Sequence, residues 1–99
     1  SGILTIKVVD QEAMTIGEDS ILAEKDVKFI QTKAVTTGSK IYVTPIGSTD
    51  NQVIYVGEID LVGKVENDGL KGFEVRIDRL EGIEDPKEIR FNWWIVETD

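Results

Sequence analysis

The chain of 99 residues contains no cysteine and no histidine. Without cysteine it cannot form a disulfide, a thiolate zinc site or a thiol nucleophile. Without histidine it lacks the commonest general base and the commonest ligand of transition metals. The usual nucleophile–base pairs of catalysis are therefore missing, and we expect a protein that is not an enzyme and uses no cofactor.

Long apolar runs are also missing. No stretch approaches the ~18 apolar residues of a membrane span, and no signal peptide is visible, so we expect no membrane insertion. Hydrophobic residues make up 40% of the chain and charged residues 30%, which is usual for a folded domain. We expect a single domain over residues 1–99. The Ser1-Gly2 start resembles a cloning remnant, which suggests a piece cut from a longer protein.

Positive charge is scarce. The formal net charge is −8, and residues 51–99 hold 6 basic and 12 acidic side chains, so 6 − 12 = −6 of it lies in that half. An acidic surface repels phosphate backbones and anionic lipids. Nucleic acid is therefore not an expected partner.

Glycine and β-branched residues dominate what is present, and no helical period is visible. We expect strands at residues 3–9, 13–16, 21–24, 27–31, 40–46, 53–62 and 73–78, and from about residue 88 onward. We expect turns at 17–20, 36–39, 47–51 and 66–69, and a single helical turn at 84–87. This spacing predicts an all-β fold, an antiparallel β-sandwich of about seven or eight short strands.

The predicted core combines the apolar residues that alternate along these strands. Its members are Ile6, Val8, Phe29, Val43, Tyr55, Phe73, Val75, Phe91, Trp93 and Ile95. Pro45 cannot donate a ladder hydrogen bond, so the strand at 40–46 should end there or lie at a sheet edge. Gly57 and Gly63 are expected at bulges or bends of the strand at 53–62.

Acidic residues are the remaining candidates for catalysis. Glu58 and Asp60, or Glu74 and Asp78, could pair as in glycoside hydrolysis. Solvated acids on outward strand faces explain the same pattern, and they also discourage edge pairing. We therefore favour the structural interpretation over a glycoside-cleaving enzyme.

Several loop residues have the oxygen-bearing side chains that calcium prefers. They are Asp50, Asn51, Glu66, Asn67 and Asp68. None follows the spacing of an EF-hand loop, and turns use the same residue types for their backbone geometry. No metal site is therefore assigned.

Both tryptophans lie in the final strand, where neighbouring side chains point to opposite faces. Trp93 shares a face with Phe91 and Ile95, which indicates core packing. Trp94 shares the other face with Arg90, Asn92 and Val96. A mixture of Trp, Arg and Asn is typical of a contact surface, although burial under a second sheet is the alternative.

Tyr42, Tyr55 and Trp94 also allow a second interpretation. Tyr and Trp rings stack on the C–H faces of sugars and carry a polar group as well. The expected interface or ligand contacts are therefore Trp94, Arg90, Asn92, Tyr42 and Tyr55.

Four stretches carry a resemblance to a known class of domain. They are Ala34 to Pro45, Val53 to Ile59, Gly72 to Ile77 and, most specific, the Phe-Asn-Trp-Trp-Ile-Val run within Ile89 to Val96. In order and spacing these resemble the C-terminal β-sandwich domain of bacterial surface and tail-fibre-like proteins, from Met14 onward. The chain departs from the pattern by an insertion, Asp60 to Leu70, which reads as an extra hairpin.

The resemblance implies a small β-sandwich that caps an elongated oligomeric stalk, commonly a homotrimer. We therefore expect a noncatalytic structural or attachment domain at the cell surface or outside the cell, assembling as a homo-oligomer. Its partners would be copies of itself, with a glycan or another cell-surface ligand as a further candidate. The alternative is a carbohydrate-binding module.

Overall fold

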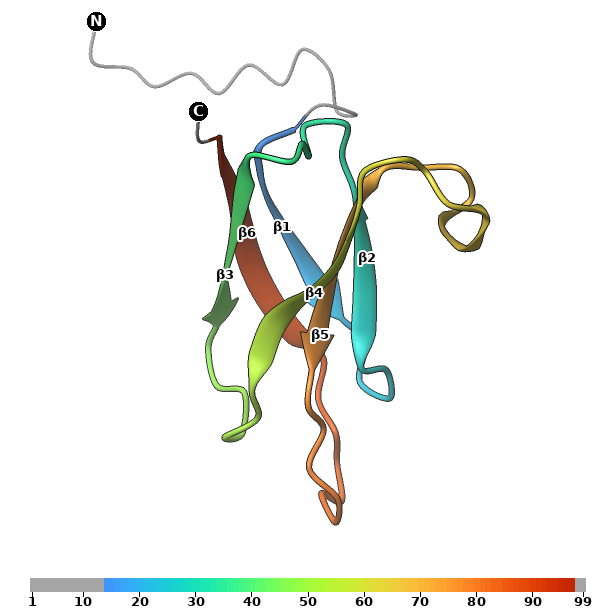
Figure 1. Cartoon of the computed structure of the whole chain (residues 1–99). Helices are drawn as coiled ribbons and strands as arrows, with labels where there is room; N and C mark the ends of the chain where they lie inside the picture. The colour runs from blue at the N-terminus through green and yellow to red at the C-terminus, as the bar shows by residue number, and fades with distance from the viewer. Residues whose placement is uncertain (1–13, 98–99) are drawn as a thin grey trace, which may run out of the picture.

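The computed structural model describes residues 14–97. The described chain forms two antiparallel three-stranded sheets, ordered β1-β6-β3 and β2-β5-β4 (Figure 1). The strands are β1 (Ile16–Ile21), β2 (Val27–Gln31), β3 (Ser39–Ile46), β4 (Ile54–Asp60), β5 (Gly72–Ile77) and β6 (Ile89–Glu97). The predicted all-β, sandwich-like fold is confirmed, but the described residues hold six strands, not seven or eight. The predicted strand at 3–9 lies outside them.

The first strand corrects three predictions at once. The predicted strands at 13–16, of which residue 13 lies outside the described residues, and at 21–24 are not separated by a turn at 17–20, because β1 runs unbroken from Ile16 to Ile21. The turn comes later, where the Lys25 N–H donates to the Leu22 carbonyl at 2.9 Å. Gly17 suggested a turn, but it lies opposite Trp93 in the sheet, and the indole occupies the space that a Cβ would need.

The segment between β5 and β6 contains no helical turn at 84–87, so that prediction was wrong. Arg79 organises this end of the molecule instead. Its guanidinium donates to the backbone carbonyls of Leu22, Lys25 and Lys87, at 2.9, 2.9 and 3.1 Å. These bonds hold Lys87 in irregular backbone immediately before β6.

The core lies between the two sheets and draws on both. Trp93 from β6 packs edge-on against Phe73 from β5, with ring centroids 5.4 Å apart and planes at 72°. Such edge-to-face pairs are favourable beyond the area that they bury. The buried hydrophobic residues are Ile21, Ile30, Val35, Phe73, Val75, Ile77, Ile89, Phe91, Trp93 and Ile95.

Most of the predicted core is confirmed. Phe73, Val75, Phe91, Trp93 and Ile95 are buried, and Val43 packs partly buried against them. Ile6 and Val8 lie outside the described residues.

Two predicted core residues are misplaced. Phe29 is only half-buried, because its neighbour Ile30 stands opposite Phe73 and takes the inward position. Tyr55 is 40% exposed, because Ile54 and Val56 supply the inward positions of β4. In both strands the apolar residues of the opposite alternation form the core.

Two glycines and a proline behave as predicted. The register of β4 against β5 shifts between Val56 and Ile59, which places Gly57 in a bulge. Gly63 has φ +82°, the left-handed conformation of a bend. Pro45 lies in β3, an edge strand of its sheet.

The segment Asp60 to Leu70 is not an extra hairpin. Between β4 and β5 it contains one short 3₁₀ turn, η2 (Val65–Asn67), and no strand. Asp68 and Gly69 follow this turn with φ of 56° and 74°, so the predicted turn at 66–69 is present in another form.

Candidate functional site

Strand β6 separates its side chains cleanly into two faces. Ile89, Phe91, Trp93 and Ile95 are buried, whereas Arg90, Asn92, Trp94 and Val96 are exposed. Trp93 is 3% exposed and Trp94 36% exposed, as the alternation predicts. Within the described chain no second sheet covers Trp94, so its side chain faces outward and the alternative of burial under a second sheet does not apply.

An apolar row crosses the outer face of the β1-β6-β3 sheet. Trp94 stands directly between Ile16 on β1 and Tyr42 on β3. The Tyr42 and Trp94 rings stack, with centroids 5.6 Å apart and planes at 22°. Ile16, Tyr42 and Val96 are 45%, 44% and 44% exposed. We call these four residues, Ile16, Tyr42, Trp94 and Val96, the outer patch.

Polar residues continue this face along β6. Asn92 lies between Glu18 and Thr44, and Arg90 between Ser20 and Ile46. The Arg90 Nη2 atom donates to Glu18 Oε1 at 3.0 Å. The sheet thus places an amide next to Trp94 and an Arg–Glu ion pair farther along the same face, a mixture typical of a contact surface.

Four of the five predicted contact residues therefore share one face: Trp94, Arg90, Asn92 and Tyr42. Tyr55 does not join them, because it lies on β4 of the other sheet. Its hydroxyl donates to Asp78 Oδ1 at 3.2 Å. Partial burial raises the pKa of Tyr55, and the Asp78 carboxylate raises it further. A platform of all three rings is not formed.

Sequence reasoning missed Ile16 as a member of this face. The reason is that β1 was divided by a predicted turn, so Ile16 was not expected opposite Trp94. Val96 was recognised on the face of Trp94 but not counted as a contact residue. Alternation along β6 already places Val96 there, whereas Ile16 is found only from the register of β1 against β6, which one strand alone does not carry.

The acidic pair Glu58 and Asp60 is not a catalytic dyad. Glu58 is exposed and pairs with the Lys64 ammonium, which raises the pKa of Lys64. Asp60 is 1% exposed and points into its own loop. The two carboxylates therefore have different partners and different surroundings.

Asp60 organises the loop that follows β4. Its carboxylate accepts hydrogen bonds from the N–H groups of Val62, Gly63 and Lys64 at 2.9, 2.8 and 2.7 Å. The Asn67 amide donates a fourth at 2.8 Å. The Asn67 bond, helped by the three backbone bonds and opposed by burial, holds the pKa of Asp60 well below its usual range. This buried acid is explained by loop structure.

Glu74 and Asp78 are likewise engaged separately. Arg76 Nε donates to Glu74 Oε1 at 2.9 Å, and this bond lowers the pKa of Glu74. Asp78 accepts from Tyr55 instead. The two carboxylates therefore have separate hydrogen-bond partners.

The predicted calcium-type residues have conformational roles. Asp50, Asn51 and Asp68 adopt φ of 55°, 64° and 56°, which Asn and Asp tolerate better than most residues. Asn67 donates to Asp60. Across residues 14–97 no three acidic side chains gather as a metal site.

Comparison with known proteins finds no matching family model, no matching curated protein and no matching solved structure. In the part of the chain that the structure describes, no helix is long and apolar enough to cross a membrane.

Proposed function

We propose that this domain is a noncatalytic structural or attachment module of a bacterial surface or fibre-like protein, and that it assembles as a homo-oligomer through the outer patch. The outer patch is the observation that carries the proposal. Its two stacked rings lie on a regular sheet face that also carries Asn92 and Arg90. Large aromatic residues on a rigid face are the usual anchors of protein interfaces.

The size of the patch sets how much it can contribute. With Trp94 36% and Tyr42 44% exposed, the two residues still offer roughly 120–200 Å² to a partner, taking about 150–250 Å² for each whole side chain. At ~25 cal/mol per Å² this burial is worth about 3–5 kcal/mol. Stable interfaces bury about 800 Å² on each partner. The outer patch would therefore be the centre of an interface whose rim comes from neighbouring polar residues.

Charge opposes self-association of this chain. Copies with a formal net charge of −8 repel one another at low ionic strength. Salt screens this repulsion over about 10 Å at 0.1 M. Assembly driven by the outer patch should therefore strengthen as salt is added, whereas assembly driven by opposite charges would weaken.

Sedimentation equilibrium of the 99-residue chain tests the proposal. We expect a mass above that of the monomer at high micromolar concentration, increasing from 20 mM to 500 mM NaCl. A strict monomer under all of these conditions would remove the assembly claim for the isolated domain.

A carbohydrate-binding module is the second candidate, favoured by the exposed Tyr42–Trp94 pair on the face that also carries Asn92 and Arg90. Tryptophan fluorescence titration with a glycan panel distinguishes the two functions. Sugar binding that Trp94→Ala abolishes without changing the mass of the particle would favour the module. Absence of a fluorescence response to every glycan would remove it.

A further inference from the structure

The loop between β4 and β5, residues 61–71, carries the two most exposed large apolar side chains of the described chain. Val65 is 93% exposed and Val62 is 78% exposed. Figure 1 shows this loop extending away from the strands. Single exposed apolar residues are ordinary, but apolar residues that gather on a projecting surface mark contact sites. We call residues 61–71 the β4–β5 loop.

The β4–β5 loop is held in one shape before any partner binds. The Asp60 carboxylate ties its first part by four hydrogen bonds. The Gly69 N–H donates to the Lys64 carbonyl at 3.0 Å, which closes the loop at its base. The base is narrow, since a Cβ at Gly63 would lie 2.5 Å from the Gly69 carbonyl oxygen. A loop ordered in this way loses little conformational entropy on docking.

The charges around the tip of this loop are mainly negative. Glu66 and Asp68 follow Val65 and are exposed. Lys64 is engaged by Glu58, and no ion pair reaches Glu66 or Asp68 within residues 14–97. A surface complementary to this loop is therefore apolar at its centre and positively charged at its rim.

The outer patch and its surroundings have these two properties. The centre is the stacked pair of Tyr42 and Trp94. The outward side chains of the three strands include two cations, Lys40 and Arg90, and one carboxylate, Glu18, so their formal sum is 2 − 1 = +1. Lys40 stands opposite Val96 and forms no ion pair within the described chain. This face thus departs from the overall formal net charge of −8.

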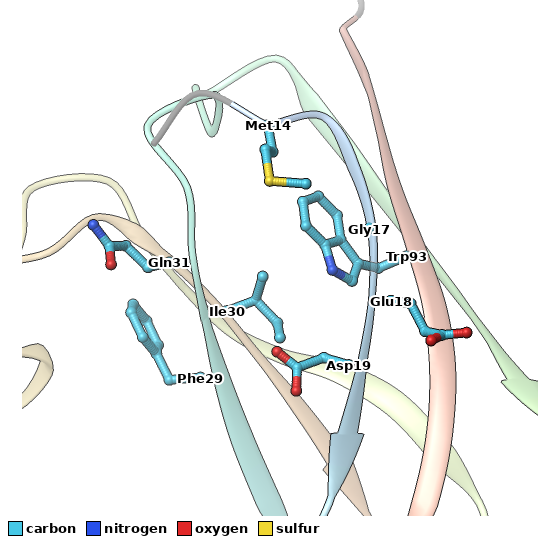
Figure 2. Close-up of a pocket in the computed structure, with 8 residues that line it drawn as sticks. All are labelled: Met14, Gly17, Glu18, Asp19, Phe29, Ile30, Gln31 and Trp93. Atoms are coloured by element: carbon cyan, nitrogen blue, oxygen red, sulfur yellow. The ribbon is translucent and has the colours of Figure 1, made fainter. Parts of the chain in front are cut away.

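A groove of about 450 Å³ between β1 and β2, beside the Trp93 indole, is a less suitable acceptor for the loop (Figure 2). Glu18 and Asp19 line this groove, and no cation does. Lys28 Nζ lies 3.9 Å from Asp19 Oδ1, so that carboxylate already takes up its charge. A loop with unpaired carboxylates gains no partner there, and charge therefore favours the outer patch.

We propose that the β4–β5 loop of one copy docks on the outer patch of the next copy. Val62 and Val65 would lie against the two stacked rings of the patch. The carboxylates that follow Val65 would lie toward Lys40. Docking of this kind rests on the proposed assembly through the outer patch and identifies the surface that covers it. Because rim charges select orientation more than they add affinity, apolar burial still drives the contact.

Such a contact runs head to tail. The loop connects two strands of the β2-β5-β4 sheet, whereas the outer patch lies on the outward face of the β1-β6-β3 sheet. One copy can therefore give its loop to one neighbour and its patch to another. Repetition of this contact produces a closed ring or an open filament, not a symmetric pair.

Sedimentation equilibrium of Val65→Ser and Val53→Ser tests this contact. Both variants change an exposed valine, one beyond each end of β4, so both should keep the wild-type Tm. Val65→Ser should associate at least ~10-fold more weakly than wild type, because an apolar side chain no longer enters the contact. Val53→Ser is the matched control and should associate as wild type does.

An equimolar mixture of Val65→Ser and Trp94→Ala identifies the docked partner. The first variant keeps an intact outer patch and the second an intact loop, so each pair regains one head-to-tail contact. At a concentration where either variant alone is monomeric, the mixture should form dimers and nothing larger.

The outcomes separate this docking from the assembly on which it rests. Wild-type association of Val65→Ser, with Trp94→Ala still impaired, would overturn the docking of the loop and leave assembly through the outer patch standing. A strict monomer for the wild-type chain would overturn both. Equal weakening by Val65→Ser and Val53→Ser, or a mixture that stays monomeric, would overturn the docking alone.

Discussion

Gly17→Ala is expected to destabilise the domain, although replacing glycine in a strand usually stabilises by about 0.5–1 kcal/mol. A Cβ at residue 17 would lie 2.7 Å from Trp93 Cζ2 and 2.8 Å from Cε2 and Nε1. Trp93 is 3% exposed and is held against Phe73, so the indole must move or strain. Overpacking of this kind costs about 1–3 kcal/mol.

The groove beside Trp93 places the expected cost of Gly17→Ala toward the lower part of that range, because the indole can shift into open space. A loss of about 1–2 kcal/mol corresponds to a decrease in Tm of roughly 4–16 °C for a domain of this size. Thermal and urea unfolding, followed by far-UV circular dichroism, measure it. Near-UV dichroism should change as well, because the surroundings of Trp93 change.

Gly57→Ala is the matched control for this prediction. Its Cβ would approach Glu74 Oε1 at 2.9 Å and Arg76 Cδ at 3.0 Å, both near the ends of flexible side chains that can move aside. We expect the free energy of unfolding of Gly57→Ala to differ from that of wild type by no more than about 1 kcal/mol. A Gly17→Ala protein at least as stable as wild type would refute the argument that the ring requires glycine there.

Three further predictions follow from individual contacts. Asp60→Asn should lower stability at pH 7, where the folded chain holds the carboxylate by four hydrogen bonds. Since folding lowers the pKa of Asp60, its carboxylate stabilises the folded chain above the unfolded pKa of about 4, and this stabilisation is lost progressively as the pH falls below that value. In urea unfolding, the difference in free energy of unfolding between wild type and Asp60→Asn should therefore become smaller from pH 7 to pH 3. A difference that stays constant over this range would contradict the argument. Arg79→Lys should lower the free energy of unfolding, measured with urea, by about 1–3 kcal/mol, because one ammonium cannot reach all three carbonyls that the guanidinium holds. An unchanged free energy of unfolding would show that water replaces these bonds. Self-association should increase with NaCl, as light scattering at fixed protein concentration would show, and a decrease would favour charge-driven contacts over the outer patch.

Alternation along single strands could be predicted from the sequence. The two tryptophans of β6 divide between core and surface as their neighbours indicate, because Phe91 and Ile95 fix which face is inward. The same logic failed at Tyr55, where a long apolar stretch offered two possible faces. The inward face was selected by Ile54 and Val56, through pairing with β5 that only the folded sheet reveals.

The interpretation of small polar residues was less successful. Gly17, Asp19 and Ser20 suggested a turn, but all three lie in β1. Gly17 serves the Trp93 ring, and Asp19 satisfies the Ser20 amide at the sheet edge. Asp60 looked like a surface acid and is buried, since its partners are backbone N–H groups whose positions depend on the loop. Such roles arise from contacts across the fold and leave no local pattern.

The central claim is that Trp94 anchors an interface between copies of the domain. Sedimentation equilibrium of wild type, Trp94→Ala and Tyr55→Ala tests it most directly, because both changes remove an exposed aromatic ring but from different sheets. Loss of about 2 kcal/mol for each buried Trp94 predicts association that is at least ~30-fold weaker for Trp94→Ala, and wild-type association for Tyr55→Ala. Equal masses for all three proteins, or a loss confined to Tyr55→Ala, would contradict the claim.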